Sequence, residues 1–169
     1  KSDGTAATTR RIKDITPVGQ LVNSTQIIVA HPYLNIKTIA DLVALAKAKP
    51  GQLNFGSVGI GSGNHLGMEL LKYMSKIDMV HVPYKGTAPA LQDLMGGNIQ
   101  ILVDTPSALM PHVKGGKIKA MGMFSANRLP AAPDVPTIAE AGGPALQSST
   151  WVMFLAPAGV PSAIVNRMA

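Results

Sequence analysis

Short apolar runs alternate with amphipathic segments along most of this chain, and this alternation is the feature that most restricts its fold. The apolar runs 26–30, 53–55, 79–82, 99–103 and 118–124 predict strands. The segments between them carry apolar residues at helical spacing, with short connections on either side. Because elements that alternate in this way form layered sheets with right-handed crossovers, we expect an α/β fold: a mostly parallel sheet with helices on both faces.

Capping signals mark where several helices begin. Thr38 and Asp41 have the spacing of a capping box, and Thr137 and Glu140 repeat that spacing. Thr87 stands where another helix is expected to be capped.

The helix that begins near Gly63 has its own predicted pattern. We expect Lys72 and Lys76 to face solvent. The buried face is expected to consist of Leu66, Leu70, Leu71 and Met74.

Composition restricts the class of protein and of partner. An apolar content of 46% and a charged content of 14% in 169 residues are typical of a folded domain. The net charge of +6 is scattered along the chain, which favours a small anionic ligand over nucleic acid. No apolar run approaches the roughly 18 residues of a membrane span, so we expect a chain that is not membrane-embedded. The absence of cysteine excludes disulfides and thiolate metal sites.

A glycine-rich loop links the apolar run 53–55 to the helix that follows. Gly59, Gly61 and Gly63 do not fit the dinucleotide-binding pattern, and the sequence has no P-loop lysine. A strand, a glycine loop and a helix start place free backbone N–H groups around one point, at the positive end of the helix dipole. Such an arrangement binds anions. The alternative is a turn that only lets strand and helix pack closely.

The donors of this loop are candidate ligand groups. They include the backbone N–H groups from Gly59 to Gly63 and the hydroxyl of Ser57. The hydroxyl of Ser62 and the amide of Asn64 are further candidates, although Ser62 has the alternative role of helix N-cap.

The carboxyl ends of the other strands supply further candidates, because ligands of such sheets bind at that edge. Asp104 is a candidate to bind a ligand amine, to orient a neighbouring group or to act as a base, with capping of the next helix as the alternative, while Thr105 offers a hydroxyl. Lys85 is expected to be solvated. We expect this edge to gather residues 31–35, 57–63, 83–86, 104–106 and the chain from 125 onward.

The four histidines show no metal-binding spacing, so the sequence predicts neither a metal site nor a cofactor. His65 lies in the first turn of its helix and is expected to pack or cap. Ser57, His65 and Asp104 have the residue types of a catalytic triad, but a triad is recognised by geometry rather than by composition. Acid–base catalysis therefore has no support from the pattern.

Taken together, the motifs resemble the extracytoplasmic solute-binding proteins of tripartite tricarboxylate transporters, the Bug or TctC-type receptors. The resemblance covers nearly all of residues 12–169. Its most specific motifs, in chain order, are Ala48-Lys-Pro-Gly-Gln-Leu-Asn-Phe-Gly-Ser57, His81-Val-Pro-Tyr-Lys-Gly86, Pro133-Asp-Val-Pro-Thr137 and Ala156-Pro-Ala-Gly159.

The resemblance implies two α/β lobes of periplasmic-binding-protein type II that close on a small carboxylate, with this sequence covering mainly the second lobe. On that basis residues 1–14 are expected to be a flexible lead-in and residues 15–150 the second lobe. Residues 151–169 are expected to cross the hinge and to begin the return to the first lobe, which is mostly absent.

The resemblance also implies a function and a set of contacts. It implies a periplasmic receptor that binds a small organic acid and delivers it to membrane transporter subunits, without catalysis. Carried over by position, the ligand contacts fall on Ser57, Gly59, Gly61, Ser62, Gly63, Asn64, Asp104 and Thr105. Relatives often have asparagine where this chain has Thr105. Two alternatives remain: an α/β enzyme that acts on a carboxylate or phosphate held by the same loop, and a structural fragment without ligand.

Overall fold

The computed structural model describes residues 15–168 and consists of two compact units. One unit runs from Ser24 to Thr150. The other comprises the chain before residue 24 together with the chain from Trp151 onward. The predicted lead-in, residues 1–14, lies outside the described residues.

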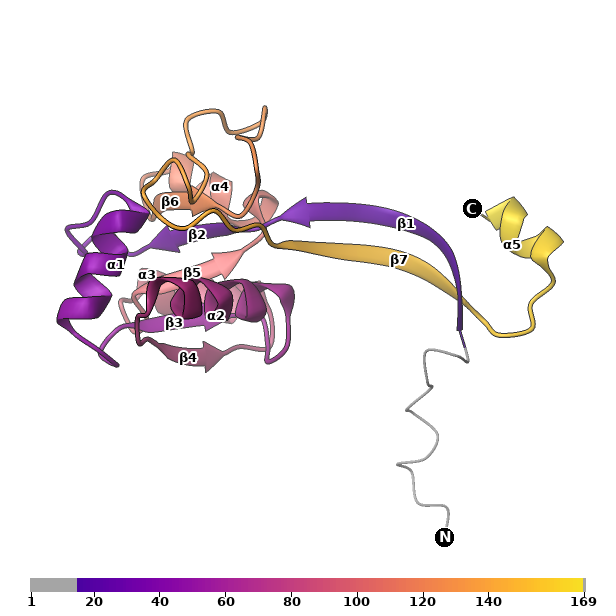
Figure 1. The fold of residues 1–169 in the computed structure, drawn as a ribbon, viewed down its shortest axis with the longest axis horizontal. Coiled ribbons are helices and arrows are strands. Elements are labelled where there is room, and N and C mark those ends of the chain that lie inside the picture. The colour runs from indigo at the N-terminus through magenta and orange to yellow at the C-terminus, as the bar shows by residue number, and fades with distance from the viewer. Residues whose placement is uncertain (1–14, 169) are drawn as a thin grey trace, which may run out of the picture. The chain divides into compact units, whose positions relative to one another are not determined.

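Figure 1 labels the helices and strands in chain order. The strands are β1 (Ile15–Thr25), β2 (Ile27–Ala30), β3 (Asn54–Ser57), β4 (Val80–Pro83), β5 (Ile101–Asp104), β6 (Lys119–Met123) and β7 (Ser149–Pro157). The helices are α1 (Ile39–Ala48), α2 (Gly63–Ser75), α3 (Thr87–Met95), α4 (Pro106–Lys114) and α5 (Ser162–Met168). The predicted alternation of strands and helices is therefore present from β2 to β6.

The larger unit contains a five-stranded sheet with the order β4-β3-β5-β2-β6. Strand β3 pairs in parallel with β4 and β5, whereas β2 pairs antiparallel with both β5 and β6. Four strands thus point the same way, as expected of a mostly parallel sheet, and β2 alone is reversed. This reversal corrects the expectation that residues 31–35 lie at the same edge as the glycine loop. They follow β2 at the opposite edge of the sheet, where the N–H of His31 donates to the carbonyl of Gln100, just before β5.

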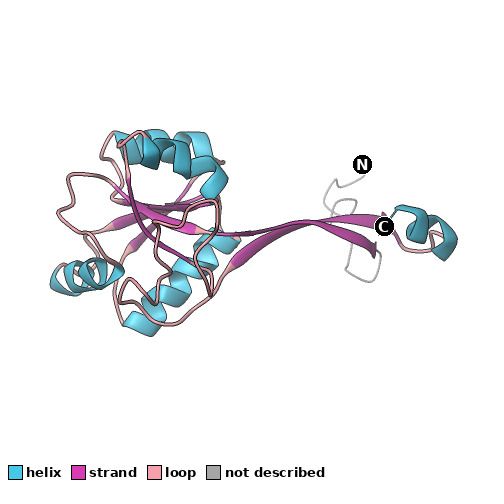
Figure 2. Cartoon of the chain, turned by 90° about the horizontal axis from the view of Figure 1, so that it is seen from above, coloured by secondary structure: helices cyan, strands magenta, loops and turns pink. Residues whose placement is uncertain are grey.

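Helices cover both faces of this sheet, as Figure 2 shows. Strands β2 and β5 are buried on both faces, and their side chains alternate between two hydrophobic clusters. On one face, α1 and α2 pack with Ile28, Ala30, Phe55, Ile101 and Val103. On the other face, α3 and α4 pack with Ile27, Val29, Leu102 and Met123. The α/β architecture with helices on both faces is confirmed.

In the smaller unit, β1 and β7 form a two-stranded sheet. Most of their large apolar side chains are exposed, among them Leu21, Val22, Trp151, Val152 and Phe154.

The capping signals led to three different outcomes. At α1 the predicted box is present, with the Thr38 hydroxyl accepting from the Asp41 N–H at 3.0 Å and the Asp41 carboxylate accepting from the Thr38 N–H. Thr137 and Glu140 make the same two bonds, but turns follow instead of a helix. The prediction for Thr87 was wrong, because Gly86 is the N-cap of α3 and Thr87 is its first residue.

The predicted buried face of α2 was mostly wrong. Its buried residues are Asn64, Gly67, Met68 and Leu71, at the i, i+3, i+4 and i+7 positions of one helical stripe. Of the four residues expected to be buried, Leu71 is, whereas Leu66, Leu70 and Met74 are exposed.

Glycine explains this choice of face. A Cβ on Gly63 would lie 2.6 Å from the Gln26 amide nitrogen, and a Cβ on Gly67 would lie 2.9 Å from the Ser148 hydroxyl. The helix therefore approaches these segments with its smallest residues, and larger apolar side chains are left outside.

Candidate functional site

Three loops meet at the carboxyl edge of β3, β4 and β5. The Tyr84 N–H donates to the Ser57 carbonyl at 2.9 Å, which joins the ends of β3 and β4. The Asn64 side chain donates to the carbonyl of Val103 at 2.8 Å, which joins the start of α2 to the end of β5. The eight residues implied by the resemblance therefore come together at one edge of the sheet.

The glycine loop between β3 and α2 is held by hydroxyl groups. Two hydroxyls donate to the Gly59 carbonyl: that of Ser57 at 3.1 Å and that of Ser62 at 2.7 Å. Gly59 has φ +147° and Gly61 has φ +76°, both in the region that favours glycine. Ile60, at the tip between them, is 79% exposed.

The first turn of α2 presents unpaired backbone donors. Ser62 is the N-cap, and its hydroxyl accepts from the His65 N–H at 3.3 Å, as the alternative role predicts. The N–H groups of Ile60, Gly63 and Asn64 have no hydrogen-bond partner within residues 15–168. Because the positive end of the helix dipole lies behind these amides, the arrangement suits an anion.

Asp104 ties the start of two helices to the end of β5. One carboxylate oxygen accepts from the Thr105 N–H at 2.7 Å and from the Asn64 amide at 3.2 Å. The other accepts from the hydroxyl of Thr87, the first residue of α3. Because Asp104 is buried and both its oxygens have protein donors, its carboxylate is engaged in holding the frame of the site. The Thr105 hydroxyl is exposed and contacts Ser107 at 3.2 Å.

The loop after β4 is fixed by a half-buried tyrosine, and its one cation, Lys85, faces solvent. The Tyr84 hydroxyl donates to the Asp93 carboxylate at 2.7 Å, which fastens the loop to α3. Burial, and then the hydrogen bond and charge of Asp93, raise the pKa of Tyr84 to about 12. Lys85 is exposed, as predicted.

This contact predicts a pH effect on stability. The folded chain holds the Tyr84 proton more tightly than the unfolded chain, whose tyrosines titrate near pH 10. The stabilisation is therefore complete below about pH 10 and is lost as pH rises toward 12. Tyr84→Phe is expected to remove this pH-dependent part and to lower the free energy of unfolding by about 1 kcal/mol at neutral pH. Urea denaturation between neutral and alkaline pH measures both; an unchanged alkaline loss in the variant would contradict the assignment.

A pair of stacked histidines lies beside the loop. The rings of His65 and His81 are 4.0 Å apart between centroids, and His81 stacks on Phe55 at 4.9 Å on its other side. The His81 Nε2 lies 2.7 Å from the Ser57 hydroxyl. Burial, and then the neighbouring His65, lower the pKa of His81.

Sequence reasoning missed His81 as part of the site. The signal that finds it is the parallel register of β3 and β4, which sets Phe55 opposite His81.

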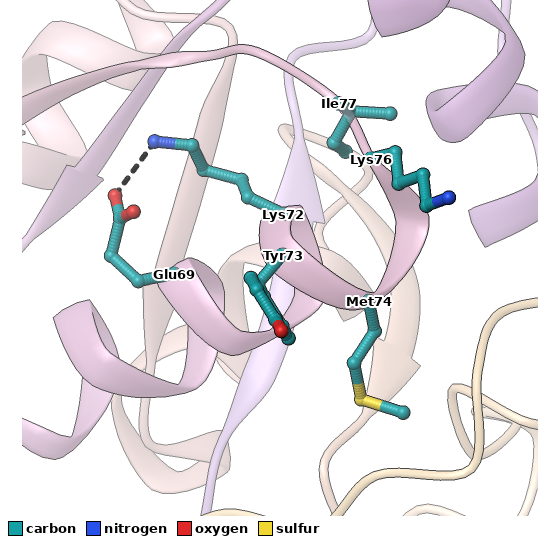
Figure 3. A pocket seen from close by; sticks show the side chains of 6 residues that line it. All are labelled: Glu69, Lys72, Tyr73, Met74, Lys76 and Ile77. Carbon is teal, nitrogen blue, oxygen red and sulfur yellow. Dashed lines mark hydrogen bonds and ion pairs between the residues drawn. The ribbon is translucent and has the colours of Figure 1, made fainter.

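A hollow of about 630 Å³ lies further along α2, lined by the six residues that Figure 3 labels. Lys72 on its wall is paired with Glu69 at 2.8 Å, and Tyr73 beside it is 83% exposed. The hollow lies toward the C-terminal end of the helix, where the dipole is negative and does not favour an anion.

The described part of the chain has neither a cluster of metal ligands nor a membrane-spanning helix. Among residues 15–168, no three His, Asp or Glu side chains gather where they would hold a metal ion. None of the helices there is both long and apolar enough to cross a membrane.

Comparison with known proteins assigns this α/β unit to a class of ligand-binding receptors. The family profile of the "Tripartite tricarboxylate transporter family receptor", TctC, matches residues 6–169. The chain belongs to this family.

Individual relatives agree with the family. Protein BugT of Bordetella pertussis is 32% identical over 154 residues, which cover 91% of this chain and 47% of BugT. Rpa4515 from R. palustris, whose structure was solved with adipate, is 35% identical in sequence. Its structure matches with a TM-score of 0.86, and the match covers 92% of this chain and 52% of the Rpa4515 chain. MatC (Rpa3494) from Rhodopseudomonas palustris, with bound malate, is 31% identical in sequence. Its structure matches with a TM-score of 0.85, and the match covers 96% of this chain and 55% of the MatC chain. The chain thus spans about half the length of these relatives.

Proposed function

We propose that this chain is part of a periplasmic receptor that binds a small organic acid through the glycine loop. The observation that carries the proposal is the set of unpaired N–H groups of Ile60, Gly63 and Asn64 at the positive end of α2. The adipate and malate named with two similar structures are dicarboxylates, which support a carboxylate as the anion.

The eight contacts implied by the resemblance divide into two roles in this proposal. The backbone N–H groups of Gly63 and Asn64 and the hydroxyl of Thr105 face the carboxylate, while the N–H of Gly61 donates to His65 Nδ1. Ser57, Gly59, Ser62 and Asp104 hold those groups in place, because their polar atoms already bond to one another and to the surrounding frame.

The unit from Ser24 to Thr150 is proposed to be the second of two lobes, with β1 and β7 as the crossings to the first. A first lobe would supply the remaining ligand contacts and would close over the carboxylate. Closure then depends on the ligand binding the closed form more tightly than the open form. The closed receptor is proposed to deliver its ligand to the membrane subunits of a tripartite transporter.

The residues that could act as bases in the alternative enzyme function already have hydrogen-bond partners. Asp104 accepts from protein donors on both oxygens, and His65 Nδ1 accepts from the Gly61 N–H at 3.2 Å. The hydroxyl of Ser57 lies near His81, but Ser57 is completely buried, and within residues 15–168 no carboxylate is hydrogen-bonded to the His81 imidazole. The family is one of receptors, which agrees with this geometry.

Thermal denaturation of the full-length receptor with a panel of acids tests the proposal. Adipate, malate, citrate and benzoate, each against the corresponding uncharged amide, separate carboxylate recognition from general packing. A carboxylate at about one hundred times its Kd is expected to stabilise the protein by about 2.7 kcal/mol, and the amide to have no effect. Stabilisation by none of the acids, or chemical conversion of a bound acid, would overturn the receptor function.

A further inference from the structure

The stacked histidines connect the glycine loop to the core of the sheet. His81 contacts Ser57 at one end of the loop, and His65 Nδ1 accepts the Gly61 N–H near its other end. Since the two rings stack at 4.0 Å, the loop is fastened at both ends by one aromatic pair.

The geometry defines where protons sit on this pair. A nitrogen that accepts an N–H carries no proton, so the bond from Gly61 requires His65 to be unprotonated at Nδ1. Two imidazolium rings at this separation repel each other, so the pair takes up one proton before a second. Burial lowers the pKa of His81, and the His65 side chain is 19% exposed.

Among the residues that the structure describes, two other charged groups face the pair, both from α2. Glu69 Oε1 lies 3.9 Å from His65 Nε2, and Lys72 is bound to Glu69 while its ammonium lies over the Phe55 ring. Glu69 therefore shares its charge between His65 and Lys72.

Building on the proposed function, we infer that His65 and His81 are positioning residues of the carboxylate site, and that uptake of a proton by the pair strengthens carboxylate binding. Without an anion, an imidazolium in the first turn of α2 is opposed by the helix dipole. A bound carboxylate offsets that dipole. Protonation of Nδ1 also releases the Gly61 N–H, which becomes a further donor to the ligand.

This coupling is reciprocal. If a proton strengthens carboxylate binding, then carboxylate binding must draw in a proton. Affinity for adipate is expected to rise about fivefold between about pH 8 and about pH 6, where aliphatic carboxylates stay ionised and histidine changes charge. Calorimetry in buffers of different ionisation enthalpy is expected to show proton uptake on binding.

His65→Gln is the decisive variant, because its side-chain oxygen can still accept the Gly61 N–H but does not titrate. It is expected to bind adipate at pH 8 within about twofold of the wild type and to lose most of the rise at pH 6. His81→Gln is expected to weaken binding at both pH values, because Ser57 loses the imidazole that contacts its hydroxyl and His65 loses its stacked partner.

His31→Gln is the matched control. His31 Nδ1 accepts the Tyr33 N–H at 3.1 Å and its ring lies 4.5 Å from the Tyr33 ring, tilted by 44°, so it too accepts a backbone N–H beside an aromatic ring, at the opposite edge of the sheet. This variant is expected to keep both the rise in affinity and the proton uptake.

The outcomes separate the two proposals. Adipate binding with equal pH dependence in wild type and His65→Gln would overturn the inference and leave the receptor function standing. Failure of every carboxylate in the panel to bind at either pH would overturn the receptor function, and the inference with it. Should His65→Gln be unstable, proton uptake by the wild type is the deciding measurement, and its absence overturns the inference.

Discussion

Asp104→Ala is expected to lower the free energy of unfolding by about 3–4 kcal/mol. The buried carboxylate accepts from the Thr105 N–H, the Asn64 amide and the Thr87 hydroxyl. Alanine removes the acceptor of all three bonds, although the Asn64 amide keeps its bond to the Val103 carbonyl. Each buried donor left in this way costs about 1–3 kcal/mol, part of which water entering the vacated space recovers. Urea denaturation followed by circular dichroism measures the change.

Asp104→Asn is the control for this result. Its oxygen can accept from Thr105 and Asn64, and its NH₂ can donate to the Thr87 hydroxyl, so we expect a loss of only about 1 kcal/mol. If Asp104→Ala were as stable as wild type but unable to bind carboxylates, Asp104 would be a ligand contact rather than part of the frame.

Gly61→Val is expected to reduce affinity for adipate by more than about tenfold while leaving the fold intact. A β-branched residue at φ +76° is strained by about 1–3 kcal/mol, and the exposed loop relieves this by rotating its peptide groups. Rotation turns the N–H groups of Gly61 and its neighbours away from the ligand. No atom lies within 4 Å of a Cβ built on Gly61, so the effect arises from backbone conformation and not from a clash.

Gly116→Val is matched to this variant. Gly116 has φ +69°, also has no atom within 4 Å of a built Cβ, and follows α4. Both substitutions are expected to cost similar stability, about 1–2 kcal/mol, but only Gly61→Val is expected to change the affinity measured by calorimetry. Equal affinities in the two variants would show that the glycine loop is only a turn.

The sequence predicted most elements of the fold but not the direction of β2. Helical and strand periodicities are local, so α1 to α4 and β2 to β6 could be found from the chain itself. A four-residue strand buried on both faces, such as Ile27–Ala30, carries no signal for its direction. Its reversal depends on pairing with β5 and β6, which are distant in sequence.

The buried face of α2 was mispredicted for a related reason. Hydrophobicity favours Leu66, Leu70 and Met74, whereas the fold buries the side that holds Gly63 and Gly67. Close approach of a helix to neighbouring segments depends on small residues, and the identity of those neighbours is set by tertiary structure.

The location of the candidate site in the fold could be predicted more readily than its individual side-chain contacts. Parallel strand ends share an edge, so the glycine loop and Asp104 could be placed together from sequence. That Asp104 faces Thr87, or that His65 stacks on His81, depends on the register between strands and on side-chain packing, which no local pattern reports.

Ile60 at the exposed tip of the glycine loop offers a practical consequence. The chain has no cysteine, so Ile60→Cys would create its single thiol, open to a maleimide dye at the point where the loop meets solvent. A dye that responds to polarity is expected to report carboxylate binding as a change in fluorescence, because a ligand bound at the loop displaces water around it. The receptor would then serve as a reagentless sensor for organic acids.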